Sequence, residues 1–344
     1  MDKKEIFKIS ILFTLLIFSI FLIVFSSKLI VHTCNDETLY GECSKIKPYY
    51  CSDGSLIENA SFCRCSTFSK LESNKCISDY QINPKEIALN YTLRGEKNQI
   101  HFTVYQKLYS YLSEIPRYNQ YDPDEESILL NFKLKSLDNQ EQRELLLPLV
   151  IMIQNLTSDK DDQARIAVSI IQNIPFGNSN KKIKFGGVSL DYFRYPYEVL
   201  YDMKGVCGEK SELLAFLLRE LGYGSAFIYY PLENHEALGI QCPLKNSLNN
   251  SGYCFIETTG PSIISDYKTE YLGVEQLSSN PEIISLEGNS TFGKSNFYEY
   301  RDFKILDTIR FRMRNYGTIN FIQHLQFQEL KRKYGLDEFT AYIF

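Results

Sequence analysis

The sequence predicts an α+β protein with one transmembrane helix, a small disulfide-rich module, and a domain in which a helix beginning at a cysteine packs on an antiparallel sheet. Three observations support this. Residues 9–27 carry no charge, six of the nine cysteines fall within residues 32–80, and the helical run that starts at Cys207 is followed by strand-like segments. With 344 residues, 44% of them hydrophobic, the chain can form one sizeable core or two modest ones.

The apolar stretch 9–27 is long enough to cross a bilayer as a helix. Three lysines lie in residues 1–8, whereas Lys28 alone follows closely, so the positive-inside rule makes residues 1–8 a cytoplasmic tail. No small-x-small cleavage site follows the stretch directly, which favours an uncleaved signal anchor over a removed signal peptide. We therefore expect a single-pass protein of the cell membrane whose main domain is extracytoplasmic.

The composition narrows the possible functions. A net charge of −5 argues against a nucleic-acid partner. The chain has no phosphate-cradling glycine loop and no His/Cys spacing typical of a catalytic zinc site, so we expect no cofactor and no metal. The oligomeric state cannot be read from the sequence. Five glycosylation sequons fit an exported chain, although an Asn- and Ser-rich sequence contains several by chance: Asn59, Asn90, Asn155, Asn249 and Asn289.

The cysteine count singles out one thiol. Residues 32–80 have few aliphatic side chains and require crosslinks to fold, and their pairing stays open because six cysteines allow many connectivities. A metal site at Cys63 and Cys65 is the weaker alternative. Cys242 and Cys254 flank a polar loop and can pair, which leaves Cys207 as a free thiol that calls for an explanation in an oxidising compartment. The clustered cysteines are Cys34, Cys43, Cys51, Cys63, Cys65 and Cys76.

Residues 84–158 are expected to supply the first strands and helices of the main domain, and no chemistry. Alternation predicts strands at 86–94 and 99–105, joined by a turn at Gly95. The other expected segments are a helix at 105–112, a strand-like piece at 128–134, and helices at 141–156 and 161–174.

Cys207 is expected in the first turn of a helix. After it, four leucines recur at helical spacing, and Gly222 stands where a helix C-cap is expected. The unpaired N–H groups and the positive dipole end of a helix N-terminus favour the thiolate over the thiol, and the thiolate is the nucleophilic form. The alternative is that Cys207 is a small apolar filler beneath the helix.

A histidine and a carboxylate follow in an order that suits Cys207. A strand is predicted at 225–230, His235 opens the next strand, and its partner strand ends at Glu257. A Cys242–Cys254 disulfide would fix these two strands so that His235 and Glu257 lie at the same end. His235 could then take the proton of Cys207 while Glu257 orients the imidazole. Each residue alone has an ordinary explanation, and the conjunction predicts a catalytic triad of Cys207, His235 and Glu257.

Residues 159–262 resemble the transglutaminase-like superfamily, a branch of the papain-like cysteine enzymes. The stretch at 164–175 is similar to the family's leading helix, Gly205-Val206-Cys207 to its nucleophile turn, and His235 to its histidine. The remaining matches are YPYEVL at 195–200, LLAFLLRELGYGSAFIY at 213–229, and Glu257-Thr258-Thr259 where Asp-Pro-Thr is usual. The resemblance implies a papain-like core with a nucleophile helix on an antiparallel sheet.

Two departures from the family pattern concern the triad. Glu257 is one methylene longer than the usual aspartate, and Glu236 follows the histidine where an apolar or small residue is commoner. A Glu236 carboxylate that points inward would raise the pKa of the imidazolium. The backbone N–H of Cys207 is a natural oxyanion donor, and the sequence does not choose the second donor among three tyrosines: Tyr192, Tyr195 and Tyr197.

The resemblance implies acyl transfer through a thioester on Cys207. Hydrolysis of an extracellular peptide or amide bond is the first expectation. Crosslinking acyl transfer to amines and a non-catalytic binding or scaffold domain are the alternatives. The expected partners are an extracellular protein or peptide and the membrane itself, through residues 9–27.

Residues 263–344 are expected to form a C-terminal extension with a locally basic helical part at 302–335. The basic residues could contact anionic lipid, or they could be the solvated face of a helix that covers the core. They are Arg310, Arg312, Arg314, Lys331, Arg332 and Lys333.

Overall fold

The computed structural model describes Thr14 and residues 32–115, 117, 128–185, 188–268, 277–294 and 296–336. Apart from Thr14, the expected cytoplasmic tail and membrane anchor, 1–8 and 9–27, lie outside the described residues. Within the described part of the chain, no helix has the length and hydropathy that a bilayer crossing requires. The anchor therefore stays a prediction from sequence.

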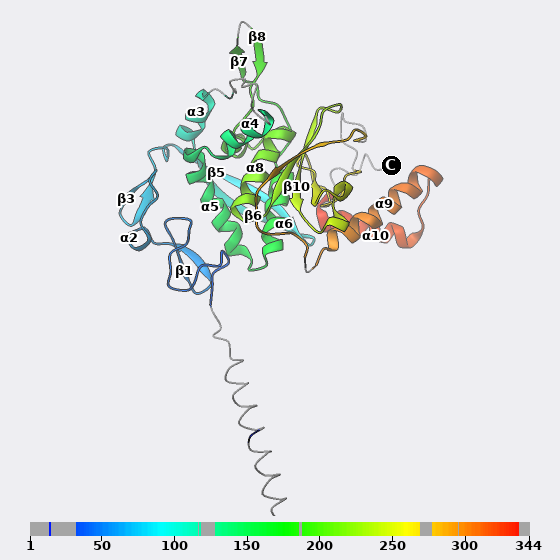
Figure 1. Cartoon of the computed structure of the whole chain (residues 1–344), viewed down its shortest axis with the longest axis horizontal. Coiled ribbons are helices and arrows are strands. Elements are labelled where there is room, and N and C mark those ends of the chain that lie inside the picture. The colour runs from blue at the N-terminus through cyan, green and yellow to red at the C-terminus, as the bar shows by residue number, and fades with distance from the viewer. Residues whose placement is uncertain are drawn as a thin grey trace, which may run out of the picture.

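The N-terminal module consists of two hairpins and a single helical turn, held by three disulfides (Figure 1). Its elements are β1 (Tyr49–Ser52), β2 (Ser55–Glu58), α2 (Ala60–Cys63), β3 (Lys70–Glu72) and β4 (Lys75–Ile77). The pairing that the sequence left open is Cys34–Cys51, Cys43–Cys63 and Cys65–Cys76.

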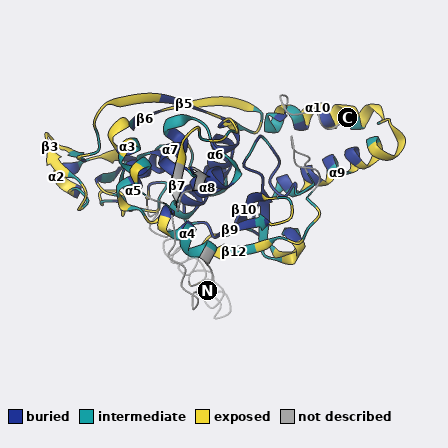
Figure 2. Ribbon diagram, turned by 90° about the horizontal axis from the view of Figure 1, so that it is seen from above, coloured by how far each residue is buried: buried dark blue, intermediate teal, exposed yellow. Residues whose placement is uncertain are grey.

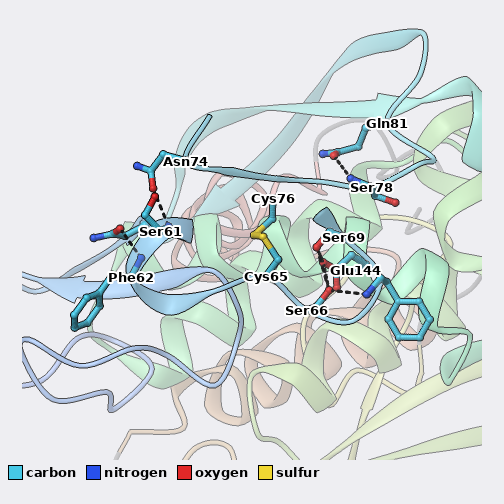
Figure 3. Close-up of a disulfide and its surroundings, with 12 residues drawn as sticks. Ser61, Phe62, Cys65, Ser66, Ser69, Asn74, Cys76, Ser78, Gln81 and Glu144 are labelled. Carbon is cyan, nitrogen blue, oxygen red and sulfur yellow. Dashed lines mark hydrogen bonds between the residues drawn. A yellow bond between two sulfur atoms is a disulfide. The ribbon is translucent and has the colours of Figure 1, made fainter. Parts of the chain in front are cut away.

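The module is docked on helix α5 (Gln140–Leu156) of the main domain. Figure 3 shows the Cys65–Cys76 disulfide beside Ser66 and Ser69, whose hydroxyls both donate to a carboxylate oxygen of Glu144 at 2.6 and 2.9 Å. The backbone N–H and carbonyl of Leu56 are both bonded by the Asn155 side chain, at 3.0 and 2.9 Å. These paired contacts fix the module against α5.

A layer of helices lies between a long hairpin and a four-stranded sheet in the main domain (Figures 1 and 2). Strands β5 (Pro84–Leu93) and β6 (Glu96–Tyr105) form the hairpin, which packs on α6 (Lys160–Asn173). The antiparallel sheet has the order β11-β10-β9-β12. Its strands are β9 (Ser225–Tyr230), β10 (His235–Gln241), β11 (Tyr253–Ile256) and β12 (Glu282–Leu286).

Helix α8 (Cys207–Glu220) is the centre of this arrangement, in contact with α6 on one side and with β9 and β10 on the other. It is buried on all faces from Gly208 to Leu218, because packed elements surround it. The remaining elements are α3 (Gln106–Glu114), α4 (Ile128–Leu137), β7 (Lys182–Phe185), β8 (Val188–Asp191), α7 (Pro196–Asp202), the 3₁₀ turns at Leu244–Asn246 and Leu248–Asn250, α9 (Tyr298–Tyr316) and α10 (Phe321–Tyr334). The mixed α+β composition with an antiparallel sheet agrees with the sequence prediction.

The prediction of a strand-like segment at 128–134 is wrong, because these residues belong to helix α4. Its residues alternate in polarity over a short stretch, which suggested a strand. Tertiary packing overrides that pattern: α4 lies on α8, and the side chains of Lys133 and Ser136, three residues apart on one helical face, both bond the buried Glu212.

The helical part of the extension is divided into two helices. Helix α9 ends at Gly317, whose φ of 68° is left-handed, and Asn320 caps the start of α10 by accepting from the backbone N–H of Gln323. Arg310 is buried and forms a bidentate pair with Asp266 at 2.6 and 2.7 Å. This basic residue therefore fixes α9 to the main domain and is not exposed to a partner.

We expect the Cys242–Cys254 disulfide, which the structure confirms, to stabilise the main domain by about 3 kcal/mol through its short loop. The Cys242→Ala/Cys254→Ala double variant should lower the free energy of unfolding of the full chain by this amount in urea titrations followed by circular dichroism. The matched control is Cys65→Ala/Cys76→Ala, which opens a loop of similar length in the module. An equal loss of main-domain stability in the control would contradict the assignment.

Candidate active site

Cys207 is the first residue of α8 and is partly exposed; it is also the free cysteine of the described chain. The turn before it is fixed by Glu209, whose carboxylate accepts from the backbone N–H of Val206 at 2.9 Å and of Arg194 at 2.7 Å. Gly205 donates its N–H to the carbonyl of Pro175 at 3.2 Å, just beyond the end of α6. Because N–H groups in a first helical turn have no intrahelical acceptor, the amides around Cys207 suit an anion.

His235 is the first residue of β10 and lies opposite Tyr230 of β9. Its side chain is 3% exposed. The ring hydrogen-bonds an oxygen of Glu257 through Nε2 at 2.9 Å, and it lines the same cleft as Cys207, whose side chain raises the pKa of the imidazole. Since Nε2 is taken by Glu257, Nδ1 is the ring nitrogen left for the thiol. The structure therefore places His235 between the cysteine and the carboxylate.

Glu257 follows the last residue of β11 and is fully buried. Pairing of Leu238 with Ile256 brings the end of β11 beside the start of β10, as the Cys242–Cys254 disulfide predicted. One carboxylate oxygen faces His235, and the other accepts from the N–H and hydroxyl of Thr259 at 2.7 and 2.6 Å. Both oxygens have partners, so the extra methylene of glutamate is accommodated.

The electrostatics of this pair favour a charged histidine. Burial lowers the pKa of His235, but hydrogen bonds to Cys207 and Glu257, together with their negative charges, outweigh burial and raise it to about 10. For Glu257, burial raises the pKa, yet the bond to His235 and its charge, with the bonds from Thr259, leave it below its ordinary value. At neutral pH the site therefore holds an imidazolium between a carboxylate and the nucleophile.

Lys210 is a charged residue of the site that the sequence reasoning missed. It lies one turn after Cys207, is fully buried, and its Nζ donates to the carbonyls of Ile174 at 2.5 Å and Thr259 at 3.2 Å. Burial lowers the pKa of Lys210 to about 7, although the negative charges of Glu257 and Cys207 oppose the shift. The spacing of three from Cys207 was the signal that could have indicated it.

Glu236 is buried, so the carboxylate beside His235 does point inward, but its charge is balanced by a lysine. Its carboxylate pairs with Lys133 of α4 at 2.9 Å, and Lys133 also pairs with Glu212 of α8 at 3.1 Å. Burial raises the pKa of Glu236, and the Lys133 charge opposes that rise. Arg117 completes the cluster through a bidentate pair with Glu212 at 2.9 and 3.0 Å. These four charged groups form one neutralised network beneath the site.

A cleft of about 590 Å³ opens over Cys207 and His235. Aromatic side chains form part of its wall: Phe132, Phe176, Tyr192, Phe193 and Tyr229. A volume of this size suits a small ligand or a few residues of an extended peptide.

Of the three tyrosines considered as oxyanion donors, only Tyr192 lines the cleft, and its hydroxyl donates to Glu198. The hydroxyl of Tyr197 accepts from the backbone N–H of Tyr105 at 2.6 Å, away from the cleft. Cys207 and Gly208 both line the cleft, and their backbone N–H groups belong to the first turn of α8, which makes them candidate oxyanion donors.

We expect one of the four histidines to stay protonated well above neutral pH, because Glu257 and Cys207 hold the charge on His235. NMR titration of ¹³C-labelled histidine side chains, assigned with His235→Ala, measures this. Glu257→Gln removes the carboxylate charge and should move the His235 titration by more than one pH unit toward its ordinary value, about 6.5.

The matched control is Glu86→Gln, which neutralises the exposed carboxylate 3.1 Å from His101 and should leave His235 unchanged. Titration of all four histidines near the ordinary value in the unmodified chain would show that the charged pair does not form.

Lys210 and His235 should tilt the pH dependence of stability in opposite directions. The folded-state pKa of Lys210 is lowered, so the unfolded chain binds more protons between about pH 7 and pH 10, and stability rises with pH there. The folded-state pKa of His235 is raised, so its contribution is complete below about pH 6.5 and is lost as pH rises through about 10.

The two slopes, each up to about 1.4 kcal/mol per pH unit, should largely cancel in the unmodified chain. In urea titrations between about pH 7 and pH 10, the free energy of unfolding of Lys210→Met should fall with pH, because only the His235 contribution remains. That of His235→Ala should rise with pH, because only the Lys210 contribution remains. Parallel pH profiles for the two variants would disprove the opposed titrations.

No family model matches the chain, and no curated protein matches it. Structural comparison finds similar chains among solved structures, including the following three. Calcium-bound LapG of Legionella pneumophila has a TM-score of 0.26 and 11% identity, over 52% of this chain and 98% of that one. A second LapG structure from Legionella pneumophila has a TM-score of 0.25 and 14% identity, over 48% and 86%. A proposed cysteine protease from Cytophaga hutchinsonii has a TM-score of 0.25 and 13% identity, over 56% and 66%. The function proposed below therefore rests on the geometry of the site and not on these similarities.

Proposed function

We propose that this chain is a cysteine enzyme that hydrolyses peptide or amide bonds by acyl transfer through a thioester on Cys207. The observation that carries the proposal is the buried His235, which is hydrogen-bonded to Glu257 and lines the same cleft as Cys207 at the start of α8. A nucleophile at a helix N-terminus, a base in contact with it, and a carboxylate that orients the base are the parts that covalent acyl transfer needs.

In the acylation step, the sulfur of Cys207 attacks the carbonyl carbon and forms a C–S bond while the carbonyl electron pair moves to oxygen. The first-turn N–H groups of α8 stabilise that oxyanion. His235 then gives its proton to the departing nitrogen, the C–N bond breaks, and a thioester remains. In the second step, neutral His235 removes a proton from water, the hydroxide attacks the thioester, and the C–S bond breaks to release the acid.

The cleft favours a substrate with uncharged side chains beside the bond that is cleaved. Five aromatic side chains contribute to its lining, and the charged residues within it are already engaged: Lys133 with Glu236, and Glu209 with Arg194 at 3.0 Å. A charged substrate group would lose its hydration without gaining a new counter-ion. We therefore propose an extracytoplasmic peptide or amide with aromatic or aliphatic groups, met by an enzyme that residues 9–27 anchor in the membrane.

The test is incubation of the full chain with a mixed peptide library, followed by mass spectrometry of the products and of the intact protein. We expect new C-termini next to aromatic or aliphatic residues, and a covalent acyl adduct on Cys207 at early times. Cys207→Ala should abolish both products, and His235→Ala should reduce the rate by about a hundredfold or more. The control is His101→Ala, an exposed histidine remote from the cleft.

Acyl acceptors are distinguished by adding a fluorescent primary amine to the same reaction. Peptides that carry the amine would show that transfer to amines, and not hydrolysis, is the main reaction. A chain that binds peptides without forming an adduct or a product would be a binding domain, and the enzymatic proposal would be rejected.

A further inference from the structure

We propose that Thr258 is a positioning residue, which joins the strand end that carries Glu257 to the helical turn that carries Cys207. The inference rests on the proposed function, because it concerns the geometry of that reaction. Thr258 is fully buried, and its hydroxyl donates to the backbone carbonyl of Cys207 at 3.3 Å. The described residues that line the cleft do not include Thr258, so it acts on the reaction through the residues that it holds.

Two members of the triad are held together within the sheet, whereas the third comes from a different layer. The pairing of β10 with β11 and the Cys242–Cys254 disulfide bring His235 and Glu257 together. Neither feature fixes Cys207, which belongs to α8. Because a displacement of about 1 Å at a reacting atom can cost about a hundredfold in rate, the contacts that span the boundary between helix and sheet bear directly on the reaction.

The hydroxyl of Thr258 is oriented by a second buried hydroxyl, on the same helix as the nucleophile. Oγ of Ser211 lies 3.2 Å from Oγ1 of Thr258. A hydroxyl has one proton and a carbonyl can only accept, so the proton of Thr258 goes to Cys207 and Ser211 donates to Thr258. The result is an ordered chain of two hydrogen bonds that ends on the backbone of the nucleophile.

A third contact joins the same two segments. Cys207, Lys210 and Ser211 have the spacing i, i+3 and i+4, which places them on one face of α8. From this face, Nζ of Lys210 donates to the carbonyl of Thr259 at 3.2 Å. The first turn of α8 is thus bonded at two consecutive positions directly after Glu257. Since a shift of one segment against the other would leave buried polar groups unpaired, these bonds hold the two segments in one relative position.

Thr258→Val keeps the shape of the side chain and removes the hydroxyl, so it tests this role in the full chain. We expect alkylation of Cys207 by iodoacetamide at neutral pH to slow about tenfold, because the sulfur is no longer held beside His235. For peptides that the unmodified chain cleaves, kcat should fall by a similar factor while KM changes little, since the cleft lining is intact. Thr258→Ser restores the hydroxyl and should recover both rates.

A second variant tests the hydrogen-bond chain independently of Thr258→Val. Ser211→Ala removes the other hydroxyl and should slow alkylation about threefold by itself. Added to Thr258→Val, it should cause no further loss, because the chain is already broken. Such non-additivity separates a coupled pair from two unrelated losses of packing.

The matched control is Ile240→Val, which removes a methyl group from a fully buried position of β10. It should lower the free energy of unfolding measured in urea but leave alkylation and kcat unchanged. Alkylation of Thr258→Val at the rate of the unmodified chain would overturn the inference. Equal slowing in Ile240→Val, or an additive loss in the double variant, would also overturn it.

The positioning role and the proposed function fail in different measurements, because alkylation needs no substrate. Slowed alkylation of Thr258→Val in a chain that cleaves no peptide would reject the hydrolase and support the positioning of Cys207. Unchanged alkylation and kcat of Thr258→Val in a chain that does cleave peptides would support the hydrolase and reject the positioning role.

Discussion

The buried contact between His235 and Glu257 is the interaction around which the site is organised. Removing an imidazolium and a carboxylate from water is costly, and their mutual attraction offsets this only if the remaining polar atoms are satisfied. The structure meets that condition: Thr259 bonds the second oxygen of Glu257, and Gln172 of α6 bonds its backbone carbonyl at 2.9 Å. The contact thus requires α6, β10 and the end of β11 to be in place together.

Helix α8 connects this contact to the rest of the domain through charges buried along its first two turns. Glu209 holds the turn before Cys207, and Lys210 reaches the carbonyls that follow α6 and β11. Glu212 is paired with Arg117 and with Lys133 of α4. Since an unpaired buried charge is strongly destabilising, each pair sets the position of the element that supplies its partner. The cysteine is therefore positioned by long-range contacts and not by α8 alone.

The cleft above Cys207 is lined in part by aromatic side chains, and its charged lining residues are paired: Lys133 with Glu236, and Glu209 with Arg194.

Much of the local structure follows from the sequence. The Gly-Val-Cys turn with its helix, the alternating strands of the β5–β6 hairpin, and the odd cysteine count are signals carried by neighbouring residues or by simple pairing. The odd cysteine count singles out Cys207. The expected pairing of Cys242 with Cys254 places the start of β10 beside the end of β11, and so predicts that His235 and Glu257 lie close together.

Tertiary structure decided what depends on partners distant in sequence. The segment at 128–134 is a helix because Lys133 and Ser136 meet Glu212, about eighty residues later, and that contact outweighs a short alternating pattern. Lys210 became part of the site only when folding placed the carbonyls of Ile174 and Thr259 around it. Local order is encoded by periodicity and turn chemistry, whereas burial of a charge is a property of the whole packed domain, so only the fold could reveal it.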